Sequence, residues 1–421
     1  MPRVVVRILH PEPRPTSGPL TRWVADARVG VAEDHRRGFL AAGADDVAIV
    51  AGPPDDRSFG ARLRDLLRTD RRVGQPAGLV VLGSGSIPLA TVADRRAFVV
   101  AAADAGQTAL ANNRYSADVV AISRTDTLPE IPELPGDNAL PRWLEEIAGY
   151  RVGDLRRRWR LAFDIDGPLD LVLLGDRSGL GDGSGTIPGR GPLPGRGPLP
   201  GRGPHPGPST LPGRGTLPDP SPLRGPGPLP GRGAPFDATV VWERVAAVRA
   251  VATDRRSELL VSGRTSAASL AWLEGHAAAR VRAWVEERGL RAASGLAQVH
   301  GQTERGTRPP RAPASILGAL LDRDGPGSLG EHLARFADAA IVDSRVLLAH
   351  RLGAEEAGWP VAEDRFASDV LLAERVADPW LRELTASAVD APIPILLGGH
   401  TLVGPGVRLV VAGPGRYLRW T

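Results

Sequence analysis

The sequence predicts an α/β protein with two domains, each built on a mostly parallel sheet. Apolar or β-branched runs alternate with helical patterns on both sides of a segment rich in Gly, Pro and Arg. Such alternation, with buried apolar strands, is typical of a parallel sheet covered on both faces. The 421 residues also exceed the roughly 100 to 200 that a single core usually occupies. We therefore expect domains at 1–175 and 237–421, joined by a linker at 176–236.

Each half has its own series of elements. In the first half, apolar or β-branched runs predict strands at 4–8, 46–51, 78–82 and 116–122. Apolar residues at helical spacing predict helices at 21–42, 59–68 and 93–105. In the second half, the same patterns predict strands at 258–261, 339–342 and 393–397, and one long amphipathic helix at 266–288. The polar, proline-containing stretch 292–313 is expected to be a mobile loop.

The linker is expected to be disordered. Its prolines block helices and sheet ladders, its glycines raise the entropy lost on folding, and its isolated leucines cannot form a core. The glycines recur at alternating spacings of two and four, which excludes a collagen helix. Either the repeat is a neutral expansion or its arginines contact RNA or acidic partners. A flexible linker of about 60 residues would span roughly 40 Å, so the two halves need not share a cleft.

Composition limits the classes of function. The chain has no cysteine, which excludes disulfides, thiolate zinc sites and cysteine nucleophiles. It has no lysine either, so all 52 basic residues are arginine, and a net charge of +4 does not by itself imply nucleic-acid binding. The start has no apolar signal core, and no apolar run approaches the roughly 20 residues of a membrane-spanning helix. We therefore expect a cytoplasmic protein without a membrane partner.

Ligands of an open parallel sheet bind beyond the carboxyl ends of the strands. Ser84 and Ser86 follow the third predicted strand in a Gly-Ser turn, where a phosphate or sugar has room to approach the backbone. Asn113 and Arg114 belong to a polar cluster before the fourth strand, where Arg114 either holds a phosphate or is solvated. Gly, Ser and Asn also form turns without any ligand, so both segments keep a purely structural interpretation.

A third candidate segment is acidic. Asp164 and Asp166 lie two residues apart, so in an extended chain both point to the same side, where their oxygens could share a Mg²⁺ ion. The alternative is that Asp166 or Asp170 caps the helix that begins at Pro168.

These segments, in this order, resemble a known family. A strand, a Gly-Ser turn followed by Ile87-Pro88-Leu89, a helix, and then Asp-Ile-Asp-Gly-Pro-Leu-Asp-Leu at 164–171 are similar to motifs of the MobA-like and CofC-like nucleotidyltransferases. The resemblance covers about 1–175. It implies a GT-A-type Rossmann-like first domain that binds a nucleotide or phosphorylated small molecule with Mg²⁺.

The sequence also departs from that family. Ser86 stands where the family has a metal-binding Asp, and a hydroxyl is a poorer Mg²⁺ ligand than a carboxylate. The Gly-rich nucleotide loop is replaced by His-Pro-Glu-Pro-Arg-Pro at 10–15, whose prolines have no amides to offer a phosphate. The family's loop lysine is absent too. Either Arg14 supplies that charge, or the domain has lost transferase activity.

The second half has candidates of its own. Gly263, Arg264 and Thr265 lie between a strand and a helix, where free amides favour an anion, although Ser or Thr there is also an ordinary helix cap. Asp343 and His400 each follow an apolar strand, and His400 could act as a general base. Taken singly, Asp343 could pair with Arg345, and a lone His is usually structural.

An acidic cluster at 363–369 adds to this possible rim, or is a solvated loop. Three functions remain open: a nucleotidyltransferase-like protein, a non-catalytic protein that binds a metabolite or partner, and an unrelated enzyme that uses Asp343 and His400. The sequence gives no indication of the oligomeric state.

Overall fold

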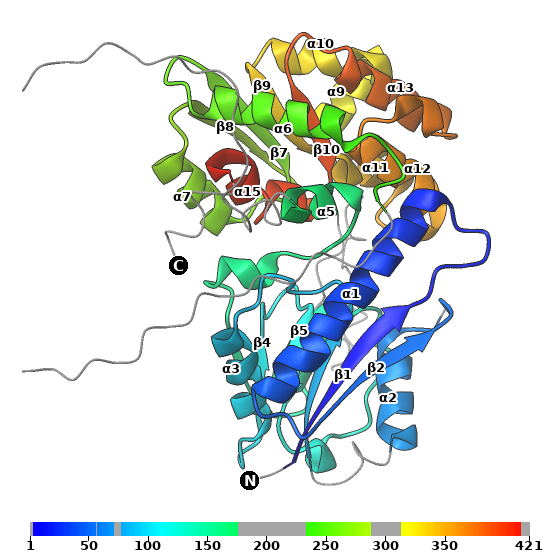
Figure 1. Ribbon diagram of the computed structural model, residues 1–421, viewed down its shortest axis with the longest axis vertical. Helices are drawn as coiled ribbons and strands as arrows, with labels where there is room; N and C mark the ends of the chain where they lie inside the picture. Colours follow the sequence, from blue (N-terminus) through cyan, green and yellow to red (C-terminus); the bar gives the residue numbers. More distant parts are fainter. Residues whose placement is uncertain (1–2, 56, 71–76, 176–232, 288–312, 414–421) are drawn as a thin grey trace, which may run out of the picture.

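The computed structural model describes residues 3–55, 57–70, 77–175, 233–287 and 313–413, which form two α/β units with one sheet each (Figure 1). The prediction of two mostly parallel sheets is confirmed. Nearly all of the predicted linker and of the predicted mobile loop, at 176–232 and 288–312, lies outside the described residues.

The first sheet has six strands in the order β2-β1-β3-β5-β4-β6. Strand β1 pairs in parallel with β2 and β3, and β4 with β6, whereas β5 is antiparallel to both of its neighbours. The strands are β1 (Arg3–Pro11), β2 (Asp46–Gly52), β3 (Ala77–Gly83), β4 (Thr108–Ala111), β5 (Val119–Ile122) and β6 (Arg151–Asp154).

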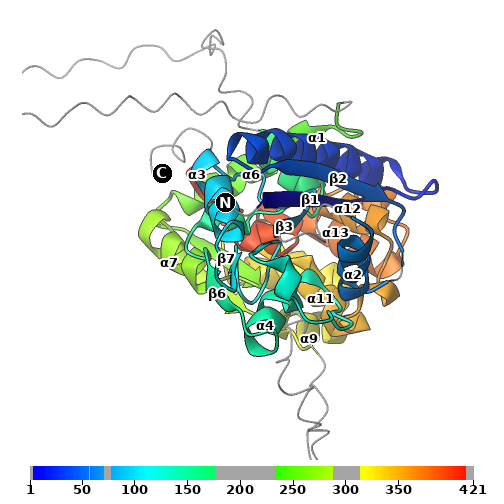
Figure 2. The same ribbon diagram turned by 90° about the horizontal axis from the view of Figure 1, so that it is seen from below.

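Helices cover both faces of the first sheet (Figure 2). Helices α1 (Pro19–Ala41) and α3 (Val92–Ala102) lie on one face and bury Phe39 and Phe98 against apolar strand residues. Helices α2 (Phe59–Thr69) and α4 (Leu140–Glu146) lie on the other face, where Leu63 and Trp143 belong to a second core. Alternate residues of β1 enter the two cores, which is the period of a strand buried on both faces.

The second sheet has the order β10-β9-β7-β8 and is parallel throughout. Its strands are β7 (Glu258–Gly263), β8 (Arg280–Val285), β9 (Ala339–Asp343) and β10 (Ile395–Gly398). Among the described residues of the second half, the α-helices are α6 (Ala238–Ala252), α7 (Ala267–His276), α9 (Ile316–Asp324), α10 (Leu329–Ala334), α11 (Ser344–Leu352), α12 (Ala362–Asp369), α13 (Pro379–Val389), α14 (His400–Val403) and α15 (Val407–Ala412). Within the described residues, no helix has the length and apolarity needed to span a bilayer.

The two halves share apolar cores. Helix α5 (Pro168–Gly175) follows the first sheet in sequence, but its Leu169 and Val172 pack with Val245 of α6 and the second sheet. Leu20 of α1 lies in a core with residues of α12 and α13. From the length of the linker, we expected that the halves need not share a cleft. They are in contact because the apolar residues of α5 and of the start of α1 are buried against the second half.

The predicted long helix at 266–288 is wrong. Helix α7 ends at His276, because Ala277 is extended, and residues 280–285 form β8 in parallel with β7. The arginines of β8 are exposed, while Val281 and Trp284 are half-buried against neighbouring cores, as expected for an edge strand. The short strands β4 and β6 were not predicted, and β5 begins at Val119, later than expected.

Candidate functional site

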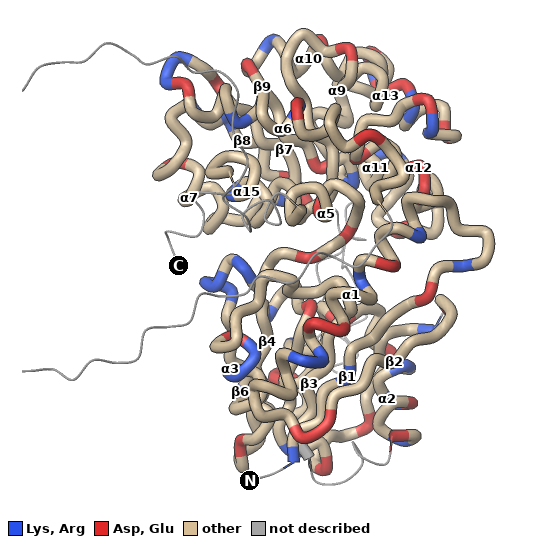
Figure 3. Tube along the Cα trace, viewed as in Figure 1, with Lys and Arg blue, Asp and Glu red and all other residues tan. Residues whose placement is uncertain are grey.

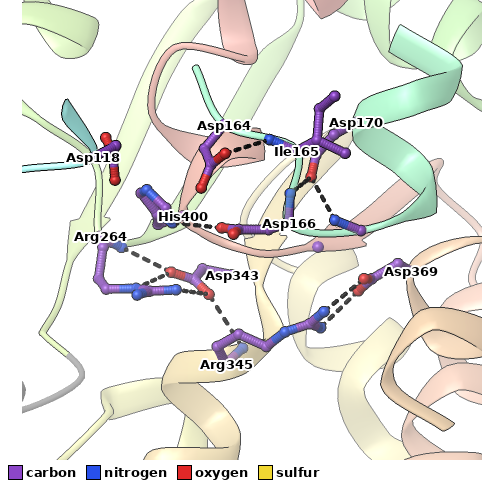
Figure 4. A network of polar contacts seen from close by, with 12 residues as sticks. Asp118, Asp164, Ile165, Asp166, Asp170, Arg264, Asp343, Arg345, Asp369 and His400 are labelled. Carbon is purple, nitrogen blue, oxygen red and sulfur yellow. Dashed lines mark hydrogen bonds and ion pairs between the residues drawn. The ribbon is translucent and has the colours of Figure 1, made fainter. Parts of the chain in front are cut away.

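The carboxyl ends of both sheets face the segment from Phe163 to Asp170. Arg264, Asp343 and His400 lie at the carboxyl ends of β7, β9 and β10, and Figure 4 shows them beside Asp164 and Asp166. Candidate residues that the sequence placed in separate domains therefore form one network. Their meeting follows from the shared cores of the two halves.

The Gly-Ser turn after β3 holds this acidic segment in place. Ser86 and Asp164 form an isolated antiparallel bridge, and the Ile165 N–H donates to the Gly85 carbonyl over 3.1 Å. From α1, Arg28 donates through Nε to the carbonyl of Ile165 over 2.8 Å. Asp164 accepts a hydrogen bond from the Ile165 N–H through Oδ1, over 2.8 Å.

The turn itself is buried and strained. Ser84 Oγ lies 3.0 Å from His10 Nδ1, and the Ser86 carbonyl lies 2.7 Å from His35 Nε2. Ile87 has φ of 45°, a conformation in which a β-branched residue is a genuine outlier. Such strain persists only where the surroundings enforce it, and it clusters at functional sites. The contacts of Ser84 and Ser86 fix the shape of the turn.

His400 and Asp166 form the central contact of the network. Nδ1 of His400 lies 3.0 Å from Oδ2 of Asp166, and the two side chains are 32% and 39% exposed. A carboxylate that accepts the Nδ1 proton leaves Nε2 as the basic nitrogen of a neutral imidazole. The carboxylate bonded to His400 is thus Asp166 from the first half, a pairing that the sequence did not predict.

Asp343 has a different partner. It accepts from Nε and Nη2 of Arg264 over 2.6 and 3.1 Å, and from the backbone N–H of Arg345, so that it also caps α11. The pKa of Asp343 is lowered, because the neighbouring Arg264 charge outweighs the effect of burial. An ionised, doubly bonded carboxylate is suited to holding Arg264 rather than to accepting a proton.

The network continues into α12 through a buried ion pair. Arg345 donates through Nη1 and Nη2 to the two oxygens of Asp369, each over 2.6 Å. The side chains are only 9% and 3% exposed. Arg345 also donates to Ser344 Oγ, which in turn donates to the Gly398 carbonyl. This pair connects the ends of β9 and β10 to α12.

The carboxyl groups of the first half repel one another. Burial, followed by the charge of Asp166, raises the pKa of Asp164 to about 7. Burial raises the pKa of Asp118 well above its ordinary value, and the nearby charge of Asp164 raises it further. Burial also raises the pKa of Asp137 to about 6 and that of Asp170 well above the ordinary value. Partial desolvation opposes ionisation of Asp166, but the hydrogen bond to His400 and its charge favour the ionised form and hold the pKa of Asp166 below its ordinary value.

The donor set matches Mg²⁺ only in part. Within the described part of the chain, no three His, Asp or Glu side chains are grouped to hold a metal ion. The predicted ligand pair was Asp164 and Asp166, but the Asp166 carboxylate is bonded to His400. Asp164 and Asp118 remain: the charge of Asp164 raises the pKa of Asp118, and Asp118 Oδ2 also accepts a hydrogen bond from Asn112 Nδ2 over 2.8 Å. Mg²⁺ typically uses one or two carboxylates together with waters and substrate phosphates, so this pair suits an ion shared with a phosphate.

No protein-family model matches this chain, and no curated protein matches it either. The functional interpretation therefore depends on the chemistry of the site.

Other predicted residues have local partners. Asn113 Oδ1 accepts from the N–H of Tyr115 in a turn, and Arg114 pairs with Glu145. Arg14 lies in an exposed loop. The partners of Asn113 and Arg114 thus lie outside the network.

Gly263 itself has a structural role. Gly263 has φ of 129°, and a Cβ there would lie 2.2 Å from Asp343 Cβ, so glycine lets β7 approach β9. Thr265 is buried, and among the described residues its Oγ1 has no hydrogen-bond partner. The acidic cluster at 363–369 also has structural roles: Glu363 accepts from the backbone N–H groups of Leu20 and Thr21 at the start of α1.

Two residues of the site, Asp118 and Arg28, were not singled out from the sequence, although Asp118 ends the polar cluster at 112–118. Asp118 precedes β5, and because β5 is antiparallel, its beginning lies beside the end of β3, with Leu82 paired to Val119. The position of Asp118 at the site depends on the direction of β5, and a short apolar run in the sequence does not specify the direction of a strand. Arg28 lies within the amphipathic helix α1, and the sequence of that helix does not indicate that its side chain reaches the carbonyl of Ile165.

Charges of both signs are intermixed along the described chain in the view of Figure 3.

Proposed function

We propose that the chain is a nucleotidyltransferase-like protein that binds a nucleotide or a phosphorylated small molecule, together with Mg²⁺, between its two sheets. The observation that carries this proposal is the His400–Asp166 contact at the carboxyl ends of the strands, beside Asp164, whose charge also raises the pKa of Asp118. Carboxylates that repel one another provide ligands for a cation, and a neighbouring basic imidazole provides proton transfer.

Each side chain has a distinct role in this proposal. Asp118 and Asp164 would hold the ion, which when bound neutralises phosphate charge. His400 accepts a proton at Nε2 from the attacking hydroxyl or water. Asp166 holds the ring through Nδ1 and stabilises the imidazolium that forms. Arg28 fixes the acidic segment through the carbonyl of Ile165.

A non-catalytic binding protein is the second candidate, and Ser86 favours it. Ser86 lies opposite Asp164 in the bridge, so a carboxylate at position 86 would add a hard ligand next to Asp164. The hydroxyl found there supplies a weaker one, which suits retained binding with reduced catalysis. An enzyme that uses the second half alone has less support, because His400 takes its carboxylate partner from the first half.

Calorimetry of the full chain with the four common nucleoside triphosphates, with and without Mg²⁺, tests the proposal. We expect binding that requires Mg²⁺, and we expect Asp164→Asn to weaken it at least about 10-fold, since a charged ligand is lost. Asp390→Asn, which changes an exposed carboxylate at the residue that follows α13, is the matched control. Binding that is independent of Mg²⁺, or unchanged in Asp164→Asn, would contradict the proposal.

Release of pyrophosphate separates the two versions. In the transferase version, water can take the place of the acceptor: its oxygen bonds to the α-phosphorus, the bond to the β-phosphate oxygen breaks, and pyrophosphate leaves. His400→Ala should abolish this release while leaving Mg²⁺-dependent affinity within about twofold. If the protein only binds, the wild-type chain should release no pyrophosphate.

A further inference from the structure

The second half places one arginine at the edge of the network in a fixed orientation. Arg264 directly follows β7, and its side chain is 20% exposed. Nε and Nη2 donate to the two oxygens of Asp343, so one edge of the guanidinium is occupied. A guanidinium has five N–H donors, and the three that remain point away from Asp343. Figure 4 shows Arg264 on the same side of the network as His400.

The support behind Arg264 is unusually rigid. Asp343 is 1% exposed and is bonded to the backbone of Arg345, whose side chain is bonded twice to Asp369. Gly263 allows β7 to lie against Asp343, since a Cβ there would collide with the Asp343 Cβ. An arginine held by a buried carboxylate loses little further entropy when its remaining N–H groups bind an anion.

We propose that Arg264 binds a second anionic group of the ligand, so that the ligand carries at least two such groups and spans both halves of the chain. This inference rests on the proposed function, in which Asp118 and Asp164 take the first group through a shared cation. The two halves contribute charges of opposite sign to the site. The first half contributes mainly carboxylates, and the second half places the Arg264 guanidinium near enough to Asp166 for the two charges to act on each other.

A second polar group lies beside this arginine. Thr265 is 5% exposed, and its Oγ1 is a buried atom without a hydrogen-bond partner in the described residues. Buried hydroxyls normally have partners, so this one needs an explanation. Thr265 directly follows Arg264 in the chain. We therefore expect an oxyanion held by Arg264 to accept a hydrogen bond from the Thr265 hydroxyl. The ligand class is therefore a diphosphate or a related molecule with two oxyanionic groups, rather than a monoanion.

Pyrophosphate and orthophosphate, each with Mg²⁺, are the probes, because they differ in the number of anionic groups and contain no base. Calorimetry on the full chain should show that Arg264→Gln weakens pyrophosphate binding by roughly 10- to 100-fold, the usual effect of losing charged hydrogen bonds. Orthophosphate binding should change by less than about twofold. Arg282→Gln, which removes an exposed strand arginine paired with Glu258, is the control and should affect neither probe.

Arg264→Gln leaves Asp343 buried without its partner and could unfold the chain. The double variant Arg264→Gln/Asp343→Asn removes both charges and keeps hydrogen-bonding groups, and it should show the same selective loss of pyrophosphate. Equal weakening of both probes, or weakening of neither, overturns the role of Arg264. In that case the proposed function still stands if Asp164→Asn removes Mg²⁺-dependent binding. If the wild-type chain binds neither the probes nor nucleotides, both proposals fail.

Discussion

Asp166 Oδ2 lies 3.0 Å from His400 Nδ1, although Asp166 precedes α5 in the first half and His400 begins α14 in the second half. Because Asp166 fixes the tautomer of His400, we expect Asp166→Asn to release the ring. In ¹⁵N NMR spectra, the Nδ1–H signal of His400 should lose its hydrogen-bonded shift or give way to the other tautomer. Asp126→Asn, a change at an exposed carboxylate of the first half, should leave that signal unchanged. An unaltered His400 spectrum in Asp166→Asn would show that the contact does not orient the ring.

The raised pKa of Asp164 predicts a specific pH dependence. Its pKa rises from 3.8 to about 7 in the folded protein, so the folded state binds more protons than the unfolded state between these values. The stabilising protonated form is therefore lost as the pH rises, and the free energy of unfolding should fall between about pH 4 and pH 7. In Asp164→Asn, the decrease in the free energy of unfolding between pH 4 and pH 7 should be smaller than in the wild type by roughly 1 kcal/mol or more. Denaturant unfolding across this range provides the measurement.

The matched comparison is Asp137→Asn, whose pKa of about 6 predicts a smaller effect that ends at lower pH. The lowered pKa of Asp343 acts in the opposite direction, because its stabilising ionised form is lost as the pH falls below about 4. A free energy of unfolding that rose steadily from pH 4 to pH 7 in both variants and the wild type would contradict the assignment to Asp164.

Gly263→Ala should be strongly destabilising. The new Cβ would lie 2.2 Å from Asp343 Cβ, and φ of 129° is unfavourable for any side chain. Strain and displacement of a buried ion pair together should cost about 3 kcal/mol or more in the free energy of unfolding. Gly275→Ala in α7 is the control, because nothing lies within 4 Å of its added Cβ. That change should stabilise the helix slightly, by about 0.5 to 1 kcal/mol.

Glu363 couples the two halves at the start of α1. This helix has no side-chain cap of its own, and Glu363 of α12 accepts from the Leu20 and Thr21 N–H groups over 3.0 and 2.9 Å. Glu363→Ala should lower the free energy of unfolding by about 1 to 2 kcal/mol, because it removes a cap and leaves helix amides unpaired. Glu363→Gln should recover part of this. Glu374→Ala at an exposed position should have little effect, and a similar loss there would show that the cap is unimportant.

The Arg345–Asp369 pair should behave as a buried ion pair. Arg345→Met leaves Asp369 buried without its counter-charge and should cost about 3 to 5 kcal/mol in thermal or denaturant unfolding. Arg345→Met/Asp369→Leu removes both charges and should recover much of that loss. If the double variant were no more stable than the single one, the pair would contribute through packing instead of charge.

Many elements follow from local sequence patterns. The apolar runs that became β1, β3, β7 and β9 are short, β-branched and bounded by turn residues, so their burial in parallel sheets was predictable. Strand β8 was not, because Arg and Trp at alternating positions of an edge strand also suit a helix surface. Its pairing with β7 overrides the local preference.

The sequence by itself determined two α/β units and identified His400, Asp164, Asp166, Arg264 and Asp343 as residues that follow or flank buried strands. The tertiary structure decided their partners: His400 with Asp166, and Arg264 with Asp343. It also brought Asp118 to the site through the antiparallel direction of β5. Which side chains pair within the site depends on how α5 and α1 bury their apolar faces against the second half. That burial depends on the whole surface of both units, which periodicity along the chain does not encode.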